Sequence, residues 1–175
     1  MIDLSMHDRV QICETKARYF RLLDTRQWDA LFEVFTVDAR IEGMPEAWGP
    51  LNSPADFITR AKEHFGKGVV SVHHGHMPEI TATGPSTARG IWSMEDYVTW
   101  PRGDRSYRGV RNPDQWGIRG FGHYEDELRR VDDGWRISFL RLTRLRIDPL
   151  VGDEAQEPGF EMVRLSPDWL TSTGT

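Results

Sequence analysis

The first part of the chain carries apolar residues at every third or fourth position, which is the period of an amphipathic helix. Charged residues separate them from about Ser5 to Leu23, so a first helix is expected there. Its apolar positions are Val10, Cys13, Ala17 and Phe20.

Two shorter helices follow in the pattern. Asp24-Thr25 offers an N-cap for a short helix that runs through Trp28 to Phe35. Residues 36–48 then read as an extended segment and a loop. Ser53-Pro54-Ala55-Asp56 starts a third helix, because Ser can cap it, Pro suits its first turn and Asp can close a capping box.

After residue 68 the pattern changes to that of β-strands. The polar segment 101–116, with Pro, Gly and several Arg, is expected to be a long loop of the kind that often forms a lid. Asp132-Asp133-Gly134 supplies the positive φ of a hairpin turn, and Pro149 is expected to end the last strand. The expected strands cover residues 69–83, 87–100, 118–131 and 135–147.

The last expected strand does not alternate cleanly. In a regular strand Trp135, Ile137 and Phe139 lie on one face, whereas Leu140 and Leu142 lie on the other. A sheet that is apolar on both faces is expected to bury its outer face too, most simply in a homo-oligomer.

Helices followed by a meander of long antiparallel strands predict an α+β fold. A curved sheet with the helices on one face would enclose a pocket. Residues 1–148 are expected to form one domain, and residues 149–175 a tail that docks on this domain or on a neighbouring subunit.

Composition narrows the class of protein. The chain has 175 residues and a net charge of -5, which gives no electrostatic reason to bind nucleic acid. The single cysteine, Cys13, excludes an internal disulfide and a multi-cysteine metal site. No apolar run reaches the ~18 residues of a membrane span, and the N-terminus lacks the order of a signal peptide. A soluble protein of the cytoplasm is therefore expected, with neither a membrane nor a nucleic-acid partner.

Three of the six histidines lie close together at His73, His74 and His76. Histidine is the usual proton shuttle near neutral pH and the commonest metal ligand. Strand alternation places His73 on the opposite face from His74 and His76. These two are expected to be structural, with pocket lining as the alternative interpretation for His76. Because no third carboxylate or cysteine ligand is evident nearby, a metal site is the less favoured interpretation of these histidines and none is assigned.

Four stretches, taken in order and at near-matching spacing, resemble the SnoaL-like branch of the NTF2-like superfamily over about Asp8 to Asp148. The nearest likeness is to bile acid 7α-dehydratases, and a more distant one is to scytalone dehydratase. The stretches are Tyr19-Phe20-Arg21-x-Leu23-Asp24 with Trp28-Asp29; Ser71-x-His73-x-Gly75-His76-x-Pro78-Glu79-Ile80; Ala88-x-Gly90-x-Trp92 with Glu95-Asp96; and Trp135 to Arg144.

The resemblance implies a cone formed by a curved antiparallel sheet and three N-terminal helices around a pocket. It implies catalytic roles for Tyr19, Asp24, His73 and Arg144, and a homo-oligomer, with a trimer favoured over a dimer. One departure is that the dehydratases have a second pocket tyrosine where this chain has Ile41-Glu42-Gly43-Met44. The 101–116 insert also differs and should reshape the pocket mouth.

Each of these residues also has a structural interpretation. Asp24 could cap the second helix, Tyr19 could be an ordinary buried aromatic residue, and His73 could be a core histidine. Arg141 and Arg144 lie on opposite faces of a regular strand, so strand register decides which one points inward. The neighbouring carboxylates Glu95 and Asp96 could be general acids, although carboxylates at such positions usually pair with arginine.

The expected function is that of a cofactor-independent lyase acting on a hydrophobic, hydroxylated aromatic or polycyclic small molecule. His73 would be the general base, held by Asp24, while Tyr19 donates to the departing oxygen and Arg144 holds an electron-rich group. Dehydration and a C–C cleavage that releases formaldehyde use the same residues. An isomerase or cyclase, or a non-catalytic ligand-binding module, is the alternative.

Overall fold

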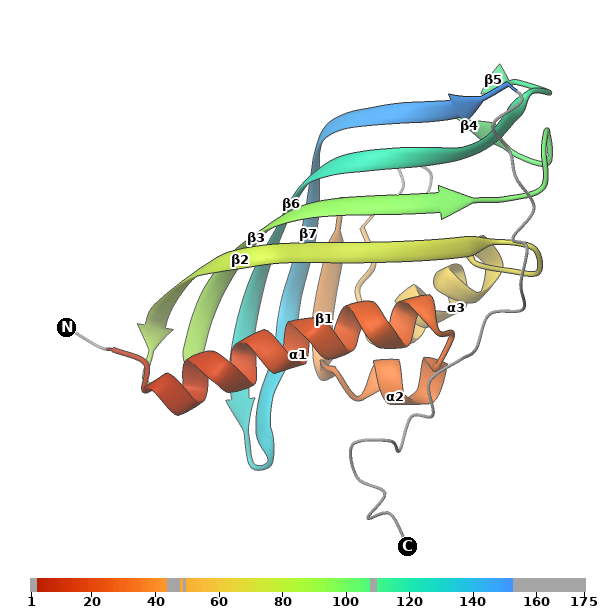
Figure 1. Ribbon diagram of the computed structural model, residues 1–175. Coiled ribbons are helices and arrows are strands. Elements are labelled where there is room, and N and C mark those ends of the chain that lie inside the picture. The colour runs from red at the N-terminus through yellow and green to blue at the C-terminus, as the bar shows by residue number, and fades with distance from the viewer. Residues whose placement is uncertain (1–2, 44–47, 49, 108–109, 153–175) are drawn as a thin grey trace, which may run out of the picture.

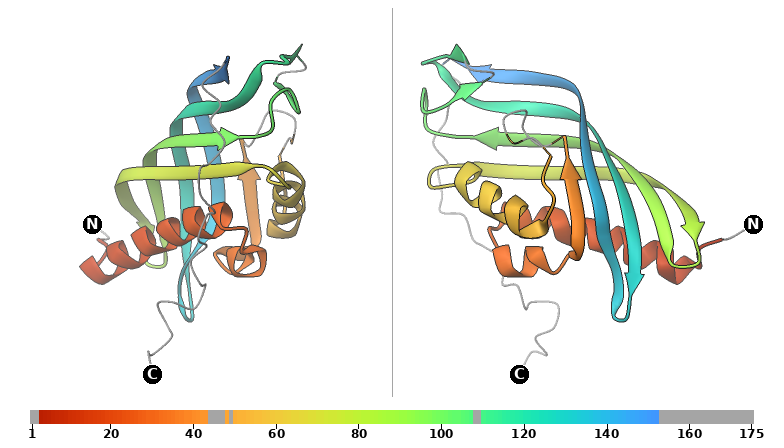
Figure 2. Two further views of the ribbon diagram at one scale, coloured as in Figure 1. Left: turned by 45° about the vertical axis from the view of Figure 1, so that its right-hand side comes forward. Right: turned by 180° about the vertical axis from the view of Figure 1, so that it is seen from behind.

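A strongly bent sheet with three helices against its inner side forms the molecule (Figure 1). The computed structural model describes residues 3–43, 48, 50–107 and 110–152. Views from two further directions show the same arrangement, with α1 crossing the inner side of the sheet (Figure 2). The predicted α+β class is confirmed.

The three predicted helices are present as α1 (Met6–Asp24), α2 (Trp28–Phe32) and α3 (Pro54–His64). Ser53 caps α3 as expected, since its Oγ accepts the backbone N–H of Asp56 at 3.1 Å. Asp24, however, is not the cap of α2. That position belongs to Gln27, whose side chain makes no capping bond, and Asp24 is instead the last residue of α1. No helix in the described residues is long and apolar enough to cross a membrane.

Five strands form the main sheet in the order β1-β7-β6-β3-β2. β1 runs parallel to β7, and the other neighbours are antiparallel. The predicted loop between β3 and β6 contains a small hairpin of β4 (Ser106–Tyr107) and β5 (Val110–Arg111). The main strands are β1 (Phe35–Glu42), β2 (Val70–Gly84), β3 (Thr87–Thr99), β6 (Gln115–Val131) and β7 (Gly134–Val151).

The prediction that Pro149 ends the last strand was wrong. β7 continues to Val151, and Pro149 stays opposite Ile118 of β6. β1 pairs with β7 only as far as Arg141, so this later part of β7 is paired on one side only. Proline is tolerated at such an edge because its missing N–H is not needed there. Most of the expected tail, residues 153–175, lies outside the described residues.

A bulge at Ser138 explains the irregular alternation in β7. Phe139 pairs with Glu127 and Ile137 with Leu128, which leaves Ser138 as an extra residue. The extra residue turns the later side chains over, so that Ile137 and Leu140 are both fully buried in one core. The inference of two apolar faces was therefore wrong, and this part of the argument for an oligomer is withdrawn.

One face of α1 carries a residue toward the sheet at every fourth position. These residues are Asp8, Ile12, Lys16, Phe20 and Asp24. The three charged ones each find a partner on the sheet: Asp8 accepts from Trp135 Nε1 at 3.1 Å, Lys16 donates to Asp126 at 2.7 Å, and Asp24 meets His73. This row sets the position of the candidate site at the C-terminal end of α1.

Candidate active site

The side chains of His73 and Asp24 form a close pair between β2 and the end of α1. His73 Nδ1 lies 2.6 Å from Asp24 Oδ1, and the backbone N–H of His73 donates to Asp24 Oδ2 at 2.8 Å. The His73 side chain is 5% exposed and that of Asp24 is 19% exposed. With the carboxylate ionised, Nδ1 carries the ring proton and Nε2 is the basic nitrogen. The structure thus brings these two predicted residues together.

Arg26 holds the end of α1 against β2. Its backbone turns sharply at a φ of 60°, directly after the helix. Its guanidinium donates to the Leu23 carbonyl and to Ser71 Oγ, both at 2.8 Å. Ser71 in turn donates to Asp24 Oδ1 at 2.8 Å. A non-glycine residue in the left-handed region costs of order 1–3 kcal/mol, so the surrounding contacts must hold it.

Arg144 faces inward and is bound by Asp96 through two parallel bonds. The distances are 2.9 Å from Nη1 to Oδ1 and 2.6 Å from Nη2 to Oδ2. Asp96 is the register partner of His73 on the neighbouring strand. A Cβ at Gly120 would come within 2.2 Å of both Arg144 Nη1 and Asp96 Oδ1, so this glycine makes room for the pair.

Arg141 and Glu95, the alternatives to Arg144 and Asp96 that the sequence left open, point away from this group. Arg141 lies on the outer side, where it binds Glu42 at 3.1 Å, and Glu95 binds Arg119 at 2.6 Å. The register of β7 therefore favours Arg144 over Arg141 as the inner arginine. Arg144 remains 25% exposed, whereas the Asp96 carboxylate is almost fully buried.

Tyr19 is fully buried, and its neighbour Tyr124 was missed by sequence reasoning. The two rings meet edge to face with centroids 5.9 Å apart. Burial, followed by the neighbouring Tyr124 and the charge of Asp126, raises the pKa of Tyr19. Burial and then the charge of Asp96 raise the pKa of Tyr124, although Arg144 and the Tyr19 hydroxyl act in the opposite direction. Both phenols therefore stay neutral and able to donate. Within the described residues, the buried Tyr19 hydroxyl makes no well-formed hydrogen bond.

Tyr124 supplies the second phenol that the region Ile41-Glu42-Gly43-Met44 lacks. It comes from β6, where it shares the inner side with Gly120, Gly122 and Asp126 at every second position. That alternation was the available signal, but only the pairing of β6 with β3 shows that Tyr124 lies opposite Trp92.

Aromatic residues and a second histidine line the side toward α3. The His64 ring meets Trp48 at a centroid distance of 5.3 Å and Phe65 at 4.9 Å, and Phe65 meets His73 at 5.8 Å. Burial, followed by the nearby charge of Arg105, lowers the pKa of His64 to about 4. His64 is therefore neutral at physiological pH. No motif in the sequence marks His64 as a site residue.

A buried ion pair of Lys16 and Asp126 lies about one helical turn before Tyr19 on α1. Lys16 Nζ donates to Asp126 Oδ2 at 2.7 Å, and the side chains are 1% and 0% exposed. The same ammonium lies 3.8 Å from the centroid of the Tyr124 ring and 4.6 Å from that of Tyr19. Burial lowers the pKa of Lys16 and raises that of Asp126. The Lys16 ammonium therefore contacts both phenol rings.

His74 and His76 lie apart from this group and are exposed. β2 is bulged between Gly75 and Pro78, and a hollow of about 520 Å³ lies there between β2 and α1. Its lining includes His76, Phe20 and Trp92 but not His73. Among the residues that the structure describes, no group of three or more His, Cys, Asp or Glu could hold a metal ion.

The inner cluster consists of six side chains, those of Tyr19, Asp24, His73, Asp96, Tyr124 and Arg144. It combines a basic imidazole nitrogen, two neutral phenols and a guanidinium held by a carboxylate. Such a set can remove a proton from one atom and donate to an oxygen on the same molecule.

Comparison with known proteins identifies the family to which most of the chain is similar. A family model described as a SnoaL-like domain matches residues 5–141. The probable cyclase FGR4 of Gibberella zeae is 26% identical over 141 residues, which cover 74% of this chain and 86% of that protein.

Solved structures share the fold. The hexachlorocyclohexane dehydrochlorinase LinA type 2 superposes with a TM-score of 0.72 at 19% identity, covering 89% of this chain and 97% of that chain. A scytalone dehydratase-like protein from Novosphingobium aromaticivorans DSM 12444 superposes with a TM-score of 0.66 at 16% identity, covering 90% and 97%. The expected NTF2-like cone is confirmed by these likenesses.

Proposed function

The chain belongs to the SnoaL-like family, and we propose that it is a lyase that acts without a cofactor on a hydroxylated aromatic or polycyclic small molecule. The observation that carries the proposal is the buried His73–Asp24 pair, with a distance of 2.6 Å, beside two neutral phenols. Relatives named as a cyclase and a dehydrochlorinase support an enzymatic role.

In the proposed mechanism His73 Nε2 is the general base. Asp24 holds the ring through Nδ1 and stabilises the imidazolium that forms when Nε2 takes the proton. Proton transfer by a positioned side chain contributes roughly 10²- to 10⁴-fold. Arg144, held by Asp96 and partly exposed, would bind an electron-rich group of the substrate.

Tyr19 is the proposed donor to the departing oxygen. Its hydroxyl is buried and makes no well-formed bond within the described residues, so a substrate oxygen would be a suitable partner. In a dehydration, His73 removes a C–H proton, the C–O bond breaks as the C=C bond forms, and the hydroxyl leaves as water with the proton from Tyr19.

A second outcome is C–C cleavage with the same groups. His73 removes the proton of a hydroxymethyl O–H, and the C–C bond breaks to give formaldehyde. Its electrons form a C=C bond as the neighbouring hydroxyl leaves as water with the proton from Tyr19. Isomerisation or cyclisation is the alternative reaction, and the likeness to a probable cyclase favours keeping it as the second candidate. A non-catalytic binding module is the alternative outside enzyme chemistry.

The test is an incubation of the purified protein, without added metal or cofactor, with hydroxylated diaryl and steroid substrates. Mass spectrometry distinguishes loss of water, loss of formaldehyde and an unchanged mass with altered retention. His73→Ala should abolish turnover, and His74→Ala is the matched control because His74 lies on the exposed side of the same strand. Full activity in His73→Ala would overturn the mechanism, and loss of activity on chelation would overturn its cofactor independence.

A further inference from the structure

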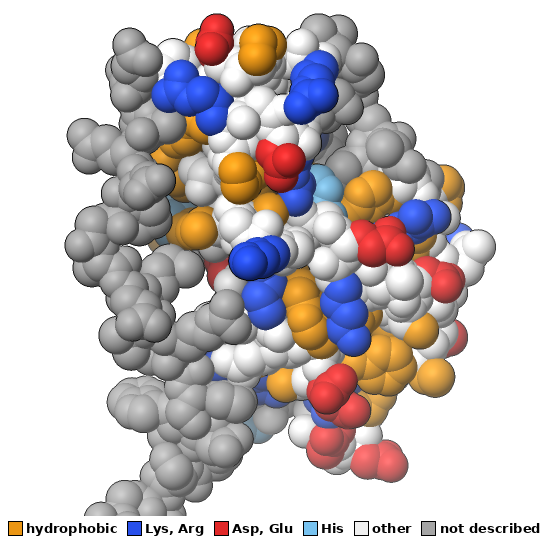
Figure 3. Space-filling view, turned by 90° about the vertical axis from the view of Figure 1, so that its right-hand side faces the viewer, with side chains coloured by type: hydrophobic (Ala, Val, Ile, Leu, Met, Phe, Trp, Pro, Cys, Tyr) orange, Lys and Arg blue, Asp and Glu red, His pale blue; other side chains and the backbone are white. Residues whose placement is uncertain are grey.

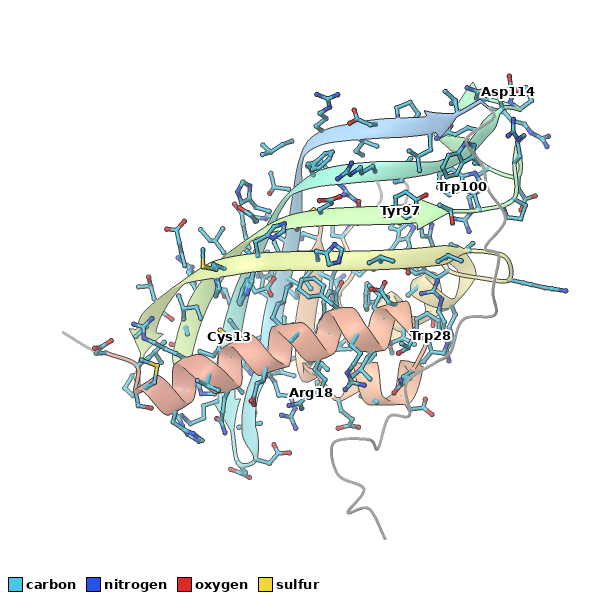
Figure 4. The ribbon with its side chains drawn as sticks, viewed as in Figure 1. Cys13, Arg18, Trp28, Tyr97, Trp100 and Asp114 are labelled. Carbon is cyan, nitrogen blue, oxygen red and sulfur yellow. The ribbon has the colours of Figure 1, made fainter. Side chains whose placement is uncertain are left out.

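Arg105 connects the segment between β3 and β6 to the end of α3. Its guanidinium donates to the backbone carbonyl of His64, the last residue of α3. Its Cζ lies 5.4 Å from the centroid of the Trp100 ring. Figure 4 shows Trp100 at the end of β3. The contact holds a cation beside the aromatic residues that flank the inner cluster.

The backbone around Arg105 is well braced. The Gly103 N–H donates to the Gln115 carbonyl at 2.9 Å, and Arg111 Nε donates to the Gly103 carbonyl at 3.0 Å. Gly103 has a φ of 70°, and a Cβ there would lie 2.9 Å from the Pro113 carbonyl oxygen. The Arg105 side chain therefore starts from a defined backbone.

The charged side chains of the inner cluster bind one another, whereas Arg105 brings a further positive charge. Asp24 faces His73, and Asp96 binds Arg144. Within the described part of the chain, no carboxylate lies within 4 Å of the Arg105 guanidinium, and the acid that acts on it is the adjacent Asp104. In the view onto this end of the molecule, Lys and Arg side chains lie across the middle with hydrophobic ones between them (Figure 3).

We propose that Arg105 binds a carboxylate of the substrate, which would make the substrate an aromatic acid. This deepens the proposed function and rests on it. The contacts from Arg105 to His64, from His64 to Phe65 and from Phe65 to His73 lead from the guanidinium to the proposed base, so the ring would lie beside these residues with its reacting carbon toward His73. A guanidinium can hold a carboxylate through two parallel N–H···O bonds. Aromatic walls with a few placed polar groups suit a flat ligand.

The test compares two probes of the same shape, 2-naphthoate and 2-naphthamide, by calorimetric titration of the full chain. The wild type should bind the acid at least tenfold more tightly than the amide. Arg105→Gln should weaken binding of the acid by roughly 10- to 100-fold, the range for a lost charged hydrogen bond, and leave the amide unchanged. Arg105→Lys should keep part of the preference, because it keeps the charge.

Arg60→Gln is the matched control, since it removes the same charge from an exposed pair with Glu63 on α3. It should bind both probes as the wild type does. Equal affinity of the wild type for the two probes, no binding of the acid at millimolar concentration, or equal loss of both probes in Arg105→Gln and Arg105→Lys would overturn the assignment. His73→Ala should lose turnover yet keep the preference for the acid. A failure of the proposed reaction can therefore be distinguished from a failure of the role assigned to Arg105.

Discussion

The Asp24 carboxylate binds both the ring and the backbone N–H of His73, with distances of 2.6 and 2.8 Å. Asp24 is the last residue of α1, and His73 lies near the start of β2. The same carboxylate thus joins two elements and orients the imidazole. A role in stability and a role in chemistry meet in one residue, and they can be separated experimentally.

Asp24→Asn should lower kcat by roughly 10²- to 10⁴-fold, because the amide can accept one bond but cannot stabilise the imidazolium. The melting temperature should be largely retained, since asparagine keeps the shape of the aspartate side chain. The measurement is kcat over a range of pH together with thermal unfolding. Asp29→Asn, on the first turn of α2, is the control and should leave kcat unchanged. Wild-type kcat in Asp24→Asn would contradict the proposed role.

Gly120→Ala should disrupt the Asp96–Arg144 pair. The added Cβ would lie 2.2 Å from both Arg144 Nη1 and Asp96 Oδ1, so the two side chains must separate or shift. Overpacking of this kind costs typically 1–3 kcal/mol. We expect lower stability in urea unfolding and a raised KM. At Gly66 the nearest atoms to an added Cβ are at 3.5 and 3.8 Å, so Gly66→Ala is the permissive control.

Local patterns predicted the elements well, and pairing decided what they could not. The Ser53 cap is a short-range signal that the sequence carries openly. The helical period of α1 was also right, but its predicted buried stripe was wrong, since Val10 and Ala17 are exposed and the face toward the sheet runs through Ile12 and Lys16 instead.

The bulge at Ser138 is not a short-range signal, because register depends on the partner strand. For the same reason the sequence left Arg141 and Arg144 undecided, since the bulge at Ser138 is what turns Arg144 inward and Arg141 outward.

The site shows the same division. Asp24 and His73 were predicted through a family likeness, and their contact spans the interface between a helix end and a strand. Tyr124 was missed because its neighbour in the site, Tyr19, lies on α1, far away in the chain. His64 was missed because it reaches the site through a contact made by the fold, in which the next residue, Phe65, packs against His73 on β2. Spacing along the chain carries no trace of such contacts.

His64 predicts a pH dependence of stability. Burial lowers its pKa from 6.5 to about 4 in the folded state, so the unfolded chain binds the proton more readily. The contribution of His64 is thus fully present above pH 6.5 and is lost as pH falls toward 4, by roughly 3 kcal/mol. Unfolding free energies from urea titrations between pH 7 and 4 measure this slope. His64→Phe should reduce it, His74→Phe should not, and an unchanged slope in His64→Phe would contradict the assignment.

The outer side of the sheet predicts self-association. Ile91 and Tyr97 are exposed on β3, where every second residue between them points inward, and Val72 is exposed on neighbouring β2. We propose a homo-oligomer, a trimer by family likeness, with a dimer as the alternative. Ile91→Asp with Tyr97→Asp should lower the mass measured by light scattering to that of one chain. Val37→Asp, at an exposed position on β1, is the control. A wild-type monomer at working concentrations would contradict the proposal.

The Lys16–Asp126 pair predicts a large difference between single and double substitution. Lys16→Met leaves a buried carboxylate without its cation and should cost about 3–5 kcal/mol of unfolding free energy. Lys16→Met with Asp126→Leu removes both charges and should recover most of that loss. Urea unfolding measures the cycle, and wild-type stability in Lys16→Met alone would contradict it. Turnover by the double variant then tests how the phenols of Tyr19 and Tyr124 are held. Retained activity means that packing alone positions them, and lost activity in a stable double variant means that the buried ammonium does.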